Sequence, residues 1–590
     1  MGDTGQIADP WMPPKTPQAL PLGKPNIYPL GERHGVSVSL PTWDSVIGLS
    51  RKEDWVLDHL ECSYPRFYIN KPVRDLSAAV LQRAIASESN TRCLVFASAD
   101  AAHKCLAALR ASTTSAEDED LALLESTRFF MPPESARDAT ACHWANFSAV
   151  LFPFSLWKKA MAFWRDTGSG LSTRHAEFCL GELDYLDCDS ADPALRSPAP
   201  LKRCHRRTPQ TLASVQTAAA GMPKLKSILA KLATSDQPSE PVVHPDDVFL
   251  YPTGMNAIFS LSECLCSITP DSTVVAFGWL YPETIEVLRG GAWKKCLSYK
   301  YGTEKELDQL ENVLQSGKQI EALFCELPSN ILLSSPDLRR IRALADKFGF
   351  IVACDDTVAG FVNLDAIACV DVMVSSLTKT FSGASNVTGG RSVFSPTIID
   401  IRTLTSPSLV VNPGSPYRNT IRAALSSKYE ETYFPLDILA LIDNCKNVVW
   451  RVRQCNENTL PLVDLLSSHR SIATVHHPST APTSSLYQSL QRKNGGYGNV
   501  LSIIFHRPAS AEHFYNILDV CKGSSFGTNF TLVIPYVQLA NYWKREKVPK
   551  YGVPQHIIRM SVGLEDSDQL VATVARALKE VEEFESQNTA

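Results

Sequence analysis

The feature that most constrains the fold is a series of short apolar runs between residues 245 and 395. The runs are rich in β-branched and aromatic residues and alternate with segments of helical pattern. They are DDVFLY (246–251), STVVAFG (272–278), EALFCEL (321–327), FIVAC (350–354) and DVMVSS (371–376). Because strands separated by helices form parallel sheets with both faces covered, the sequence predicts an α/β domain with a mainly parallel central sheet.

One helix between these runs is marked by signals at both of its ends. The segment SPDLRRIRALADKFG, residues 335–349, repeats its apolar residues on one helical face. Ser335 is suited to cap the N-terminus, Pro336 to occupy the first position, and Gly349 to end the helix. We therefore predict a helix over this segment.

Composition favours a soluble enzyme of several domains. The chain has 590 residues, 44% of them hydrophobic and 20% charged, with a net charge of −5. One core rarely exceeds about 250–300 residues, so two or three domains are expected. Without a basic excess or a long apolar run, no nucleic-acid partner and no membrane association are expected. The 16 cysteines lack zinc spacing and the start lacks a secretory signal, which predicts no metal site and a reducing, cytoplasmic location.

Changes in pattern along the chain suggest four parts. Residues 1–34 are Pro-rich and are expected to form a loosely packed arm, and residues 35–160 an N-terminal α/β extension of unknown role. A cofactor domain is expected at 161–397 and a smaller C-terminal α/β domain at 398–590. The surface loops expected from acidic or Pro-rich composition are TTSAEDED (113–120), DSADPALRSPAP (189–200) and DQPSEPVVHP (236–245).

A lysine among hydroxyl residues follows the last of the five strands. Ligands of parallel sheets bind beyond the carboxyl ends of the strands, so Lys379 and Asp355 are expected at one rim together with Asn330. Most lysines are solvated surface charges, but a desolvated lysine at such a rim can form a Schiff base with a carbonyl. An aspartate suits a protonated pyridine nitrogen.

Hydroxyls and a helix N-terminus suit a phosphate; the candidates are Ser376, Thr378, Thr253, Gly254 and Met255. Together these groups suggest pyridoxal 5'-phosphate (PLP) as cofactor.

The motifs resemble those of the Cys/Met-metabolism family of PLP enzymes, most closely its fungal cystathionine γ-synthase branch. They occur in family order over about residues 245–570: YPTGMNAI, WLYPET, CELPSN, CDDT, SSLTKTFSGASNVTGG, GGYGNVLSI, GSSFGTNFTL and IIRMSVGLED. The resemblance implies the aminotransferase-like fold known as fold type I. Four positions depart from the family pattern, namely Asp356, Ile331, Pro282 and Asn499.

The resemblance also implies roles for individual residues. Lys379 would be the Schiff-base lysine, Asp355 the partner of the pyridine nitrogen, and Tyr281 the residue that stacks on the cofactor ring and assists proton transfer. Arg559 would bind the substrate carboxylate with Ser525 nearby. Asn330 of CELPSN belongs to the same set of cofactor contacts.

One position of the family pattern has two candidates in this chain. In the family, a Tyr-x-Arg segment reaches across a dimer to the phosphate of the neighbouring subunit. Tyr64 and Arg66 keep the tyrosine but precede Thr253 by almost two hundred residues. Arg174 is nearer, in a Gly/Ser-rich turn that opens a helix, but Ser172 replaces the tyrosine. We favour Arg174 and expect a homodimer or homotetramer with shared active sites.

The resemblance implies γ-replacement on an O-acylated L-homoserine, with cysteine as nucleophile and cystathionine as product. Lys379 would remove and return protons, and small amino acids would be the partners. Three alternatives stay open. The same electrophile could react with another thiol or a carbon nucleophile in specialised metabolism, the enzyme could be a γ- or β-lyase, or the chain could be a catalytically silent regulator or scaffold.

Overall fold

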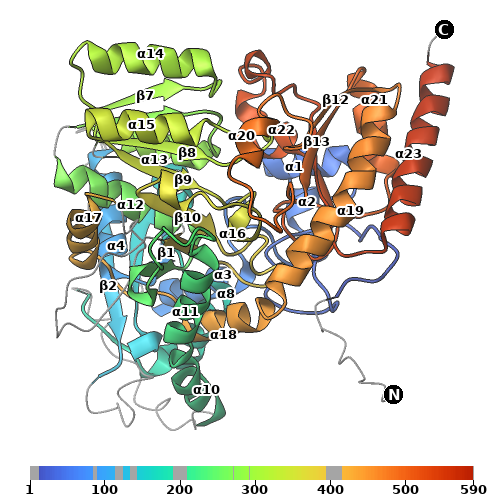
Figure 1. Cartoon of the computed structure of the whole chain (residues 1–590). Helices are drawn as coiled ribbons and strands as arrows, with labels where there is room; N and C mark the ends of the chain where they lie inside the picture. Colours follow the sequence, from blue (N-terminus) through green and yellow to red (C-terminus); the bar gives the residue numbers. More distant parts are fainter. Residues whose placement is uncertain are drawn as a thin grey trace, which may run out of the picture.

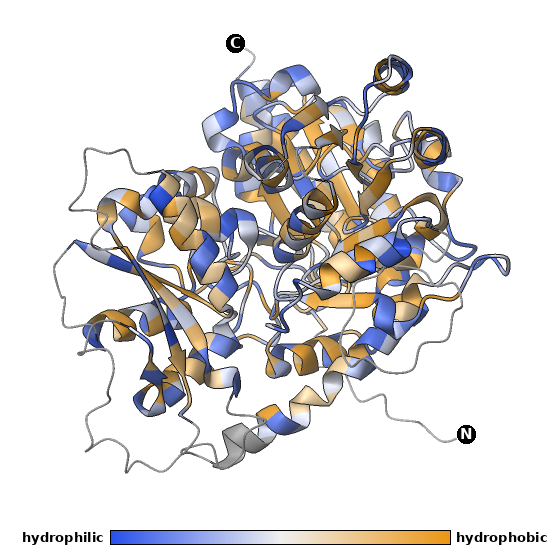
Figure 2. Cartoon of the chain, turned by 90° about the vertical axis from the view of Figure 1, so that its left-hand side faces the viewer, coloured by the Kyte–Doolittle hydropathy of each residue, from blue (hydrophilic) through white to orange (hydrophobic). Residues whose placement is uncertain are grey.

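The computed structural model describes residues 12–83, 90–112, 124–132, 143–190, 209–269, 272–291, 293–393 and 415–588. Three β-sheets organise these residues (Figure 1). The central sheet has seven strands, the C-terminal sheet five and the N-terminal sheet four. In Figure 2 the hydrophobic colour gathers on strands in the interior, where the buried apolar side chains form the cores.

The central sheet contains all five strands that the apolar runs predict. Its order is β5-β11-β10-β9-β8-β6-β7, and β11 is the strand that runs antiparallel to its neighbours. The fold is therefore the predicted α/β class with a mainly parallel central sheet. The strands are β5 (Val248–Tyr251), β6 (Thr273–Phe277), β7 (Lys295–Tyr299), β8 (Ala322–Glu326), β9 (Ile351–Asp355), β10 (Val372–Ser376) and β11 (Gly390–Val393).

Helices between the strands pack on this sheet and complete its core. They are α12 (Gly254–Ile268), α13 (Pro282–Gly290), α14 (Glu304–Gln315) and α15 (Leu338–Phe348). Helix α15 is the helix predicted over 335–349, and Gly349 ends it in the left-handed conformation at φ +74°. The predicted cap is wrong: Asp337, not Ser335, caps α15 by accepting a hydrogen bond from Arg340 N. Both side chains can cap a helix, and Ser335 is instead buried before the first turn.

The C-terminal part forms the expected second α/β domain. Its sheet has the order β12-β13-β16-β15-β14. Long helices α19 (Val448–Ser468) and α23 (Ser567–Gln587) pack beside it with α21 (Pro508–Ile517) (Figure 1). Helix α18 (Pro435–Asn444) precedes them. The strands are β12 (Ile472–His476), β13 (Val500–Phe505), β14 (Cys521–Lys522), β15 (Leu532–Pro535) and β16 (Ile558–Ser561).

An antiparallel sheet with its own core separates the N-terminal segment from the cofactor domain. The sheet order is β1-β3-β2-β4, and most of the core lies between Ile69 and Cys188, with Val215 and Phe434 added to it. We call residues 71–188 the insertion. The predicted boundary at residue 160 is wrong because it falls inside α7, which belongs to this core. The elements are α3 (Lys71–Arg83), β1 (Thr91–Phe96), α4 (Ala99–Ala111), β2 (Glu125–Phe130), β3 (Phe147–Pro153), α7 (Trp157–Thr167), α8 (Thr173–Glu182) and β4 (Asp187–Cys188).

Residues 12–62 pack mainly on the C-terminal domain, and His34 also contacts Thr173 of the insertion. Asn26 Nδ2 donates to Lys522 O at 3.1 Å, and Ser37 Oγ donates to Ser524 O at 2.6 Å. Helix α1 (Trp43–Arg51) buries its apolar face against the same domain. The described part of the Pro-rich arm is thus packed in places, since Ile27 is fully buried whereas Leu30 is 65% exposed. The sequence pattern cannot show this because the partners lie almost 500 residues away.

Two of the three predicted surface loops lie wholly or mostly outside the described residues, as does the predicted boundary at 397. The third loop, 236–245, connects α11 (Gly221–Ala233) to the short helix before β5. Among the described helices, none combines the length and apolar character needed to cross a membrane.

Replacing Trp43 with alanine should destabilise the C-terminal domain, because its ring is buried and packs edge-on against Tyr515 at 6.0 Å. Loss of a buried aromatic ring costs about 3–5 kcal/mol. Trp55→Ala is the matched control, since this ring is 47% exposed and its loss should cost less than about 1 kcal/mol. Denaturant unfolding measures both. Equal effects of the two substitutions would contradict the docking of α1 on the C-terminal domain.

Candidate active site

The carboxyl ends of three neighbouring parallel strands bring the predicted rim residues together. Strands β8, β9 and β10 lie side by side, with Glu326 paired to Asp355 and Asp355 to Val374 in register. Lys379 lies in the turn that follows β10. One cavity is lined by Asp355, Ser376 and Lys379 together with Asn330. The rim predicted from the strand pattern is therefore a real cluster of side chains.

Lys379 is buried inside this cavity. Its Nζ donates a hydrogen bond to Ser525 Oγ at 2.8 Å, and the atom lies 4.0 Å from the centroid of the Tyr64 ring. Burial, together with the positive charges of Arg559 and Arg66, lowers the pKa of Lys379 well below its ordinary value. A lysine with a lowered pKa offers a neutral amine that can attack a carbonyl or accept a proton.

Of the two adjacent aspartates, Asp355 is the one that lines the cavity. It accepts a hydrogen bond from Thr357 N at 2.9 Å, and burial raises its pKa. Asp356 is buried apart from the cavity lining and accepts a hydrogen bond from Ser375 Oγ. The strand alternation that sends successive side chains to opposite faces explains this division.

Glu326 is a residue of the cavity that our site prediction omitted. Its carboxylate accepts hydrogen bonds from Tyr281 N and, at 3.0 Å, from Asn330 N. Burial and the neighbouring Asp355 raise the pKa of Glu326. The signal was present in the CELPSN motif, where Glu326 is the last residue of β8. Glu326 fixes the backbone on which Tyr281 and Asn330 are carried.

Arg559, on β16, brings a second cation into the cavity from the C-terminal domain. It donates to Asn330 Oδ1 at 3.1 Å and to Ser525 O at 2.5 Å. Burial lowers the pKa of Arg559 to about 10, and its guanidinium lies 4.9 Å from the centroid of Phe526. Arg559, Asn330 and Ser525 thus meet at one end of the cavity, which suits recognition of a carboxylate.

The phosphate candidates gather at the N-terminus of α12. Thr253 caps this helix by accepting from Asn256 N at 3.0 Å, and Gly254 and Met255 line the cavity. Gly254 packs so closely that a Cβ there would lie 2.9 Å from Ser376 Cβ. Thr378 accepts from Gly389 N at 2.9 Å and lines an adjoining cavity. The amide groups at the start of a helix favour an anion at this position.

The structure brings Tyr64 and Arg66, and not Arg174, into the cavity of Lys379. Arg66 Nε lies 2.7 Å from Glu283 Oε1, and its guanidinium lies 4.9 Å from the centroid of Tyr281. One chain supplies these arm residues to its own cavity, whereas the family resemblance implies an arm from a neighbour.

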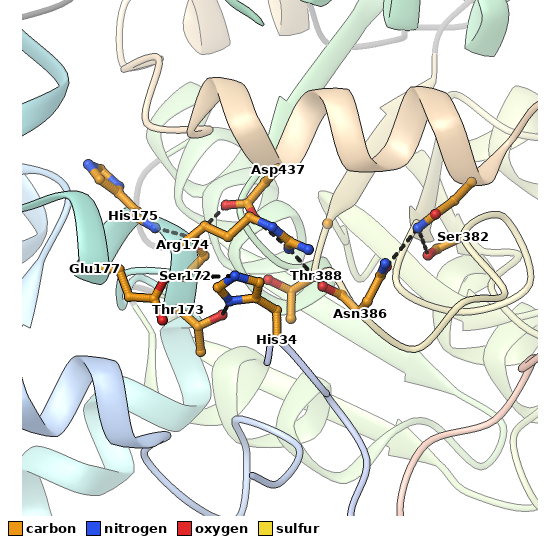
Figure 3. A network of polar contacts seen from close by, with 12 residues as sticks. His34, Ser172, Thr173, Arg174, His175, Glu177, Ser382, Asn386, Thr388 and Asp437 are labelled. Carbon is orange, nitrogen blue, oxygen red and sulfur yellow. Dashed lines mark hydrogen bonds and ion pairs between the residues drawn. The ribbon is translucent and has the colours of Figure 1, made fainter. Parts of the chain in front are cut away.

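Arg174, which we favoured from the sequence, is engaged elsewhere. It lies on α8, pairs with Asp437 at 3.2 Å and donates to Asn386 O at 2.7 Å (Figure 3). Arg174 thus lies outside the Lys379 cavity but lines the adjoining one beside Thr253 and Thr378. The identity of the phosphate arm stays a prediction, with Arg66 the better placed candidate within one chain.

The basic and acidic side chains of this buried cavity suit PLP. Three basic side chains, Arg66, Lys379 and Arg559, face one cavity with the carboxyl groups of Asp355 and Glu326. Burial lowers the pKa of Lys379 most and the positive charges of Arg559 and Arg66 lower it further, so anions beside the two arginines would be favourable. PLP with an amino acid would supply a phosphate and a carboxylate, and Asp355 would face the pyridine nitrogen. The residues present fit this cofactor.

Comparison with known proteins agrees with this geometry. The family described as "Cys/Met metabolism PLP-dependent enzyme" matches residues 242–579, more than half of the chain. The chain belongs to this family. A second family, described as "Fungal trans-sulfuration enzyme, N-terminal domain", matches residues 72–172, within the insertion. The chain is thus a PLP-dependent enzyme of the cystathionine γ-synthase-like group.

Two relatives align along most of this chain. The chain is 41% identical over 563 residues to "Cystathionine gamma-synthase-like protein ankD" of Aspergillus thermomutatus, covering 95% of each chain. It is 31% identical over 633 residues to "Cystathionine gamma-synthase" of Neurospora crassa, covering 95% of this chain and 98% of the relative. A crystal structure of cystathionine gamma synthase from Xanthomonas oryzae pv. oryzae in complex with cystathionine has the same fold. It aligns with a TM-score of 0.52 and 20% identity over 62% of this chain and 88% of that one.

Replacing Glu326 with glutamine should flatten the pH dependence of stability in the PLP-free protein. The folded-state pKa of Glu326 is raised from 4.5 to about 8, so the folded chain binds more protons than the unfolded chain within this window. The free energy of unfolding should therefore fall as the pH rises through it. Denaturant unfolding of both proteins across the window measures the slope. An equally steep fall in Glu326→Gln would contradict this titration.

Proposed function

We propose that the enzyme catalyses PLP-dependent γ-replacement on an O-acylated L-homoserine, with cysteine as nucleophile. The observation that carries this proposal is the buried Lys379 amine, which shares one cavity with Asp355, Arg66 and Arg559. This set joins a nucleophilic amine to binding groups for the cofactor ring, a phosphate and a substrate carboxylate. Membership in the cystathionine γ-synthase-like group supports the same reaction class.

Each end of the cavity has a distinct binding task in this proposal. Arg66 with the amides at Gly254 and Met255 holds the phosphate, while Asp355 accepts a hydrogen bond from the pyridine nitrogen. When bound, PLP serves as an electron sink that makes the α-carbon proton of the substrate acidic. Arg559 holds the α-carboxylate, with Asn330 and Ser525 fixing its guanidinium.

Proton movement is assigned to Lys379. Its lowered pKa keeps a share of neutral amine, which can take a proton from the substrate α-carbon and return it at a later carbon. Ser525 Oγ, 2.8 Å from Nζ, holds the amine in place between these transfers.

Tyr281 lines the same cavity, and burial raises its pKa well above the ordinary value. Its hydroxyl therefore stays protonated and is suited to donate rather than to act as a base.

A second candidate keeps the electrophile but replaces cysteine with another thiol or a carbon nucleophile. Identity is higher to the "cystathionine gamma-synthase-like" relative, at 41%, than to the Neurospora crassa synthase, at 31%. The cavity also has an apolar wall that includes Phe67, Ile534 and Leu539, which suits a nucleophile less polar than cysteine.

Assembly as a dimer or tetramer and a cytoplasmic location stay predictions.

Incubating the purified protein with PLP, O-acetyl-L-homoserine and cysteine should give cystathionine. O-Succinyl- and O-phosphohomoserine, other thiols and β-keto acids complete the panel, with products read by mass spectrometry. Lys379→Ala should give no product because the proton-transferring amine is lost. Product only with another nucleophile would favour the second candidate. Release of a keto acid without added nucleophile would instead favour a lyase.

Replacing Arg66 with alanine should weaken PLP retention, whereas Arg174→Ala should not. The two arginines form a matched pair, because each contacts a buried carboxylate, Glu283 or Asp437. Loss of a charge-assisted contact to phosphate costs about 1.5–3 kcal/mol, roughly a tenfold to hundredfold change in affinity. Dialysis followed by absorbance measures the cofactor that remains. The opposite ranking would return the phosphate contact to Arg174.

A further inference from the structure

We propose that the insertion positions the phosphate-binding end of the active site through the connection between α7 and α8. We call residues 167–172 the brace, and residues 253–256 the phosphate turn. The inference rests on the proposed placement of the PLP phosphate at this turn. No described residue of the insertion lines the Lys379 cavity, so any effect on PLP must pass through neighbouring segments such as the phosphate turn.

The brace contacts the residue that caps α12. Thr253 Oγ1 donates its proton to Gly168 O at 3.0 Å and accepts from Asn256 N at 3.0 Å. A hydroxyl has one proton, so giving it to the brace directs the oxygen lone pairs toward the helix amide. The Gly254 and Met255 amides then remain oriented toward the phosphate.

A second set of hydrogen bonds joins the same two segments. Asn256 Nδ2 donates to Thr167 O at 3.2 Å and lies 3.4 Å from Ser169 Oγ. Three successive brace residues therefore contact the first turn of α12. Backbone carbonyls supply two of these contacts, so the contact depends on the path of the brace backbone.

Gly168 makes this close approach possible. It ends α7 in the left-handed conformation, at φ +61°. A Cβ at this position would lie 2.3 Å from Thr253 Oγ1 and 2.8 Å from Asn256 N. A side chain at residue 168 would therefore push the phosphate turn away from the brace.

Helix α7 also reaches the other proposed phosphate ligand. Arg165 Nε lies 3.6 Å from Glu283 Oε1, the carboxylate oxygen that holds Arg66 at 2.7 Å. The end of α7 thus contacts the phosphate turn directly and Arg66 through Glu283. Both attachments converge on the same end of the active site.

A separate anchor holds the insertion in place. Helix α8 is tied to the cofactor domain and to α18 through Arg174, whose partners are Asp437 and Asn386 O (Figure 3). His34 Nδ1 lies within hydrogen-bonding distance of Thr173 Oγ1, at 3.0 Å, which adds the N-terminal segment to this network. These contacts lie at α8 and include no residue of the phosphate turn, so loss of the anchor provides a control for simple destabilisation.

The test compares PLP affinity with stability in full-length variants. Gly168→Ala should weaken PLP binding by about tenfold, the equivalent of one phosphate hydrogen bond, and Asn256→Ala by roughly threefold. Gly181→Ala is the matched control, because Gly181 lies in α8 and a Cβ there meets no atom within 4 Å. Its PLP affinity should stay within about twofold of wild type. Arg174→Ala should lower the melting temperature without changing PLP affinity.

Spectroscopic titration gives the PLP dissociation constants, and thermal unfolding is recorded with and without PLP. Unchanged PLP affinity in both Gly168→Ala and Asn256→Ala would overturn the inference. An equal loss of PLP affinity in Arg174→Ala and Gly181→Ala would also overturn it. Asn256→Ala adds no atoms, so it keeps the test decisive if Gly168→Ala fails to fold. Borohydride reduction of the wild type should attach PLP to Lys379. Failure of that reaction would refute the proposed site itself, separately from the brace.

Discussion

The hydrogen bond from Lys379 Nζ to Ser525 Oγ joins the cofactor domain to the C-terminal domain inside a buried cavity. Ser525 adopts an uncommon left-handed backbone at φ +85°, and its carbonyl is held by Arg559. Strain of this kind persists only where surrounding contacts determine it. The two domains must therefore be docked before the Lys379 amine is buried and hydrogen-bonded to Ser525. The chemistry of Lys379 depends on that docking.

The charges of the cavity follow from the same burial. Desolvation disfavours every charged form, which lowers the pKa of Lys379 and raises those of Asp355 and Glu326. Without a ligand, the cavity thus holds groups displaced from their ordinary protonation states. An anionic cofactor and a zwitterionic substrate would supply opposite charges to these groups. Binding them explains why several ionisable side chains occupy a mostly buried space.

The sequence predicts those structural features that depend on the local pattern of residues. The strands of the central sheet, the end of α15 at Gly349 and the rim that unites Asp355 with Lys379 all follow from periodicity and from the rule for parallel sheets. The errors concern long-range packing. Arg66 reaches the cavity because residues 12–62 dock on a domain almost 500 residues away. The boundary at 160 failed because α7 shares a core with an antiparallel sheet whose strands β2 and β4 carry mixed polarity.

The insertion lies between the two segments that the proposed phosphate site needs. Arg66 precedes it and Thr253 follows it, so the chain must return to its starting point after almost two hundred residues. An unstructured connection would carry the full entropy of loop closure, whereas a folded unit with its own core fixes its two ends relative to each other. Helix α3, which follows Arg66, packs against α8, which follows the brace. The fold of the insertion therefore brings the two phosphate elements together, and the brace is where that geometry reaches the phosphate turn.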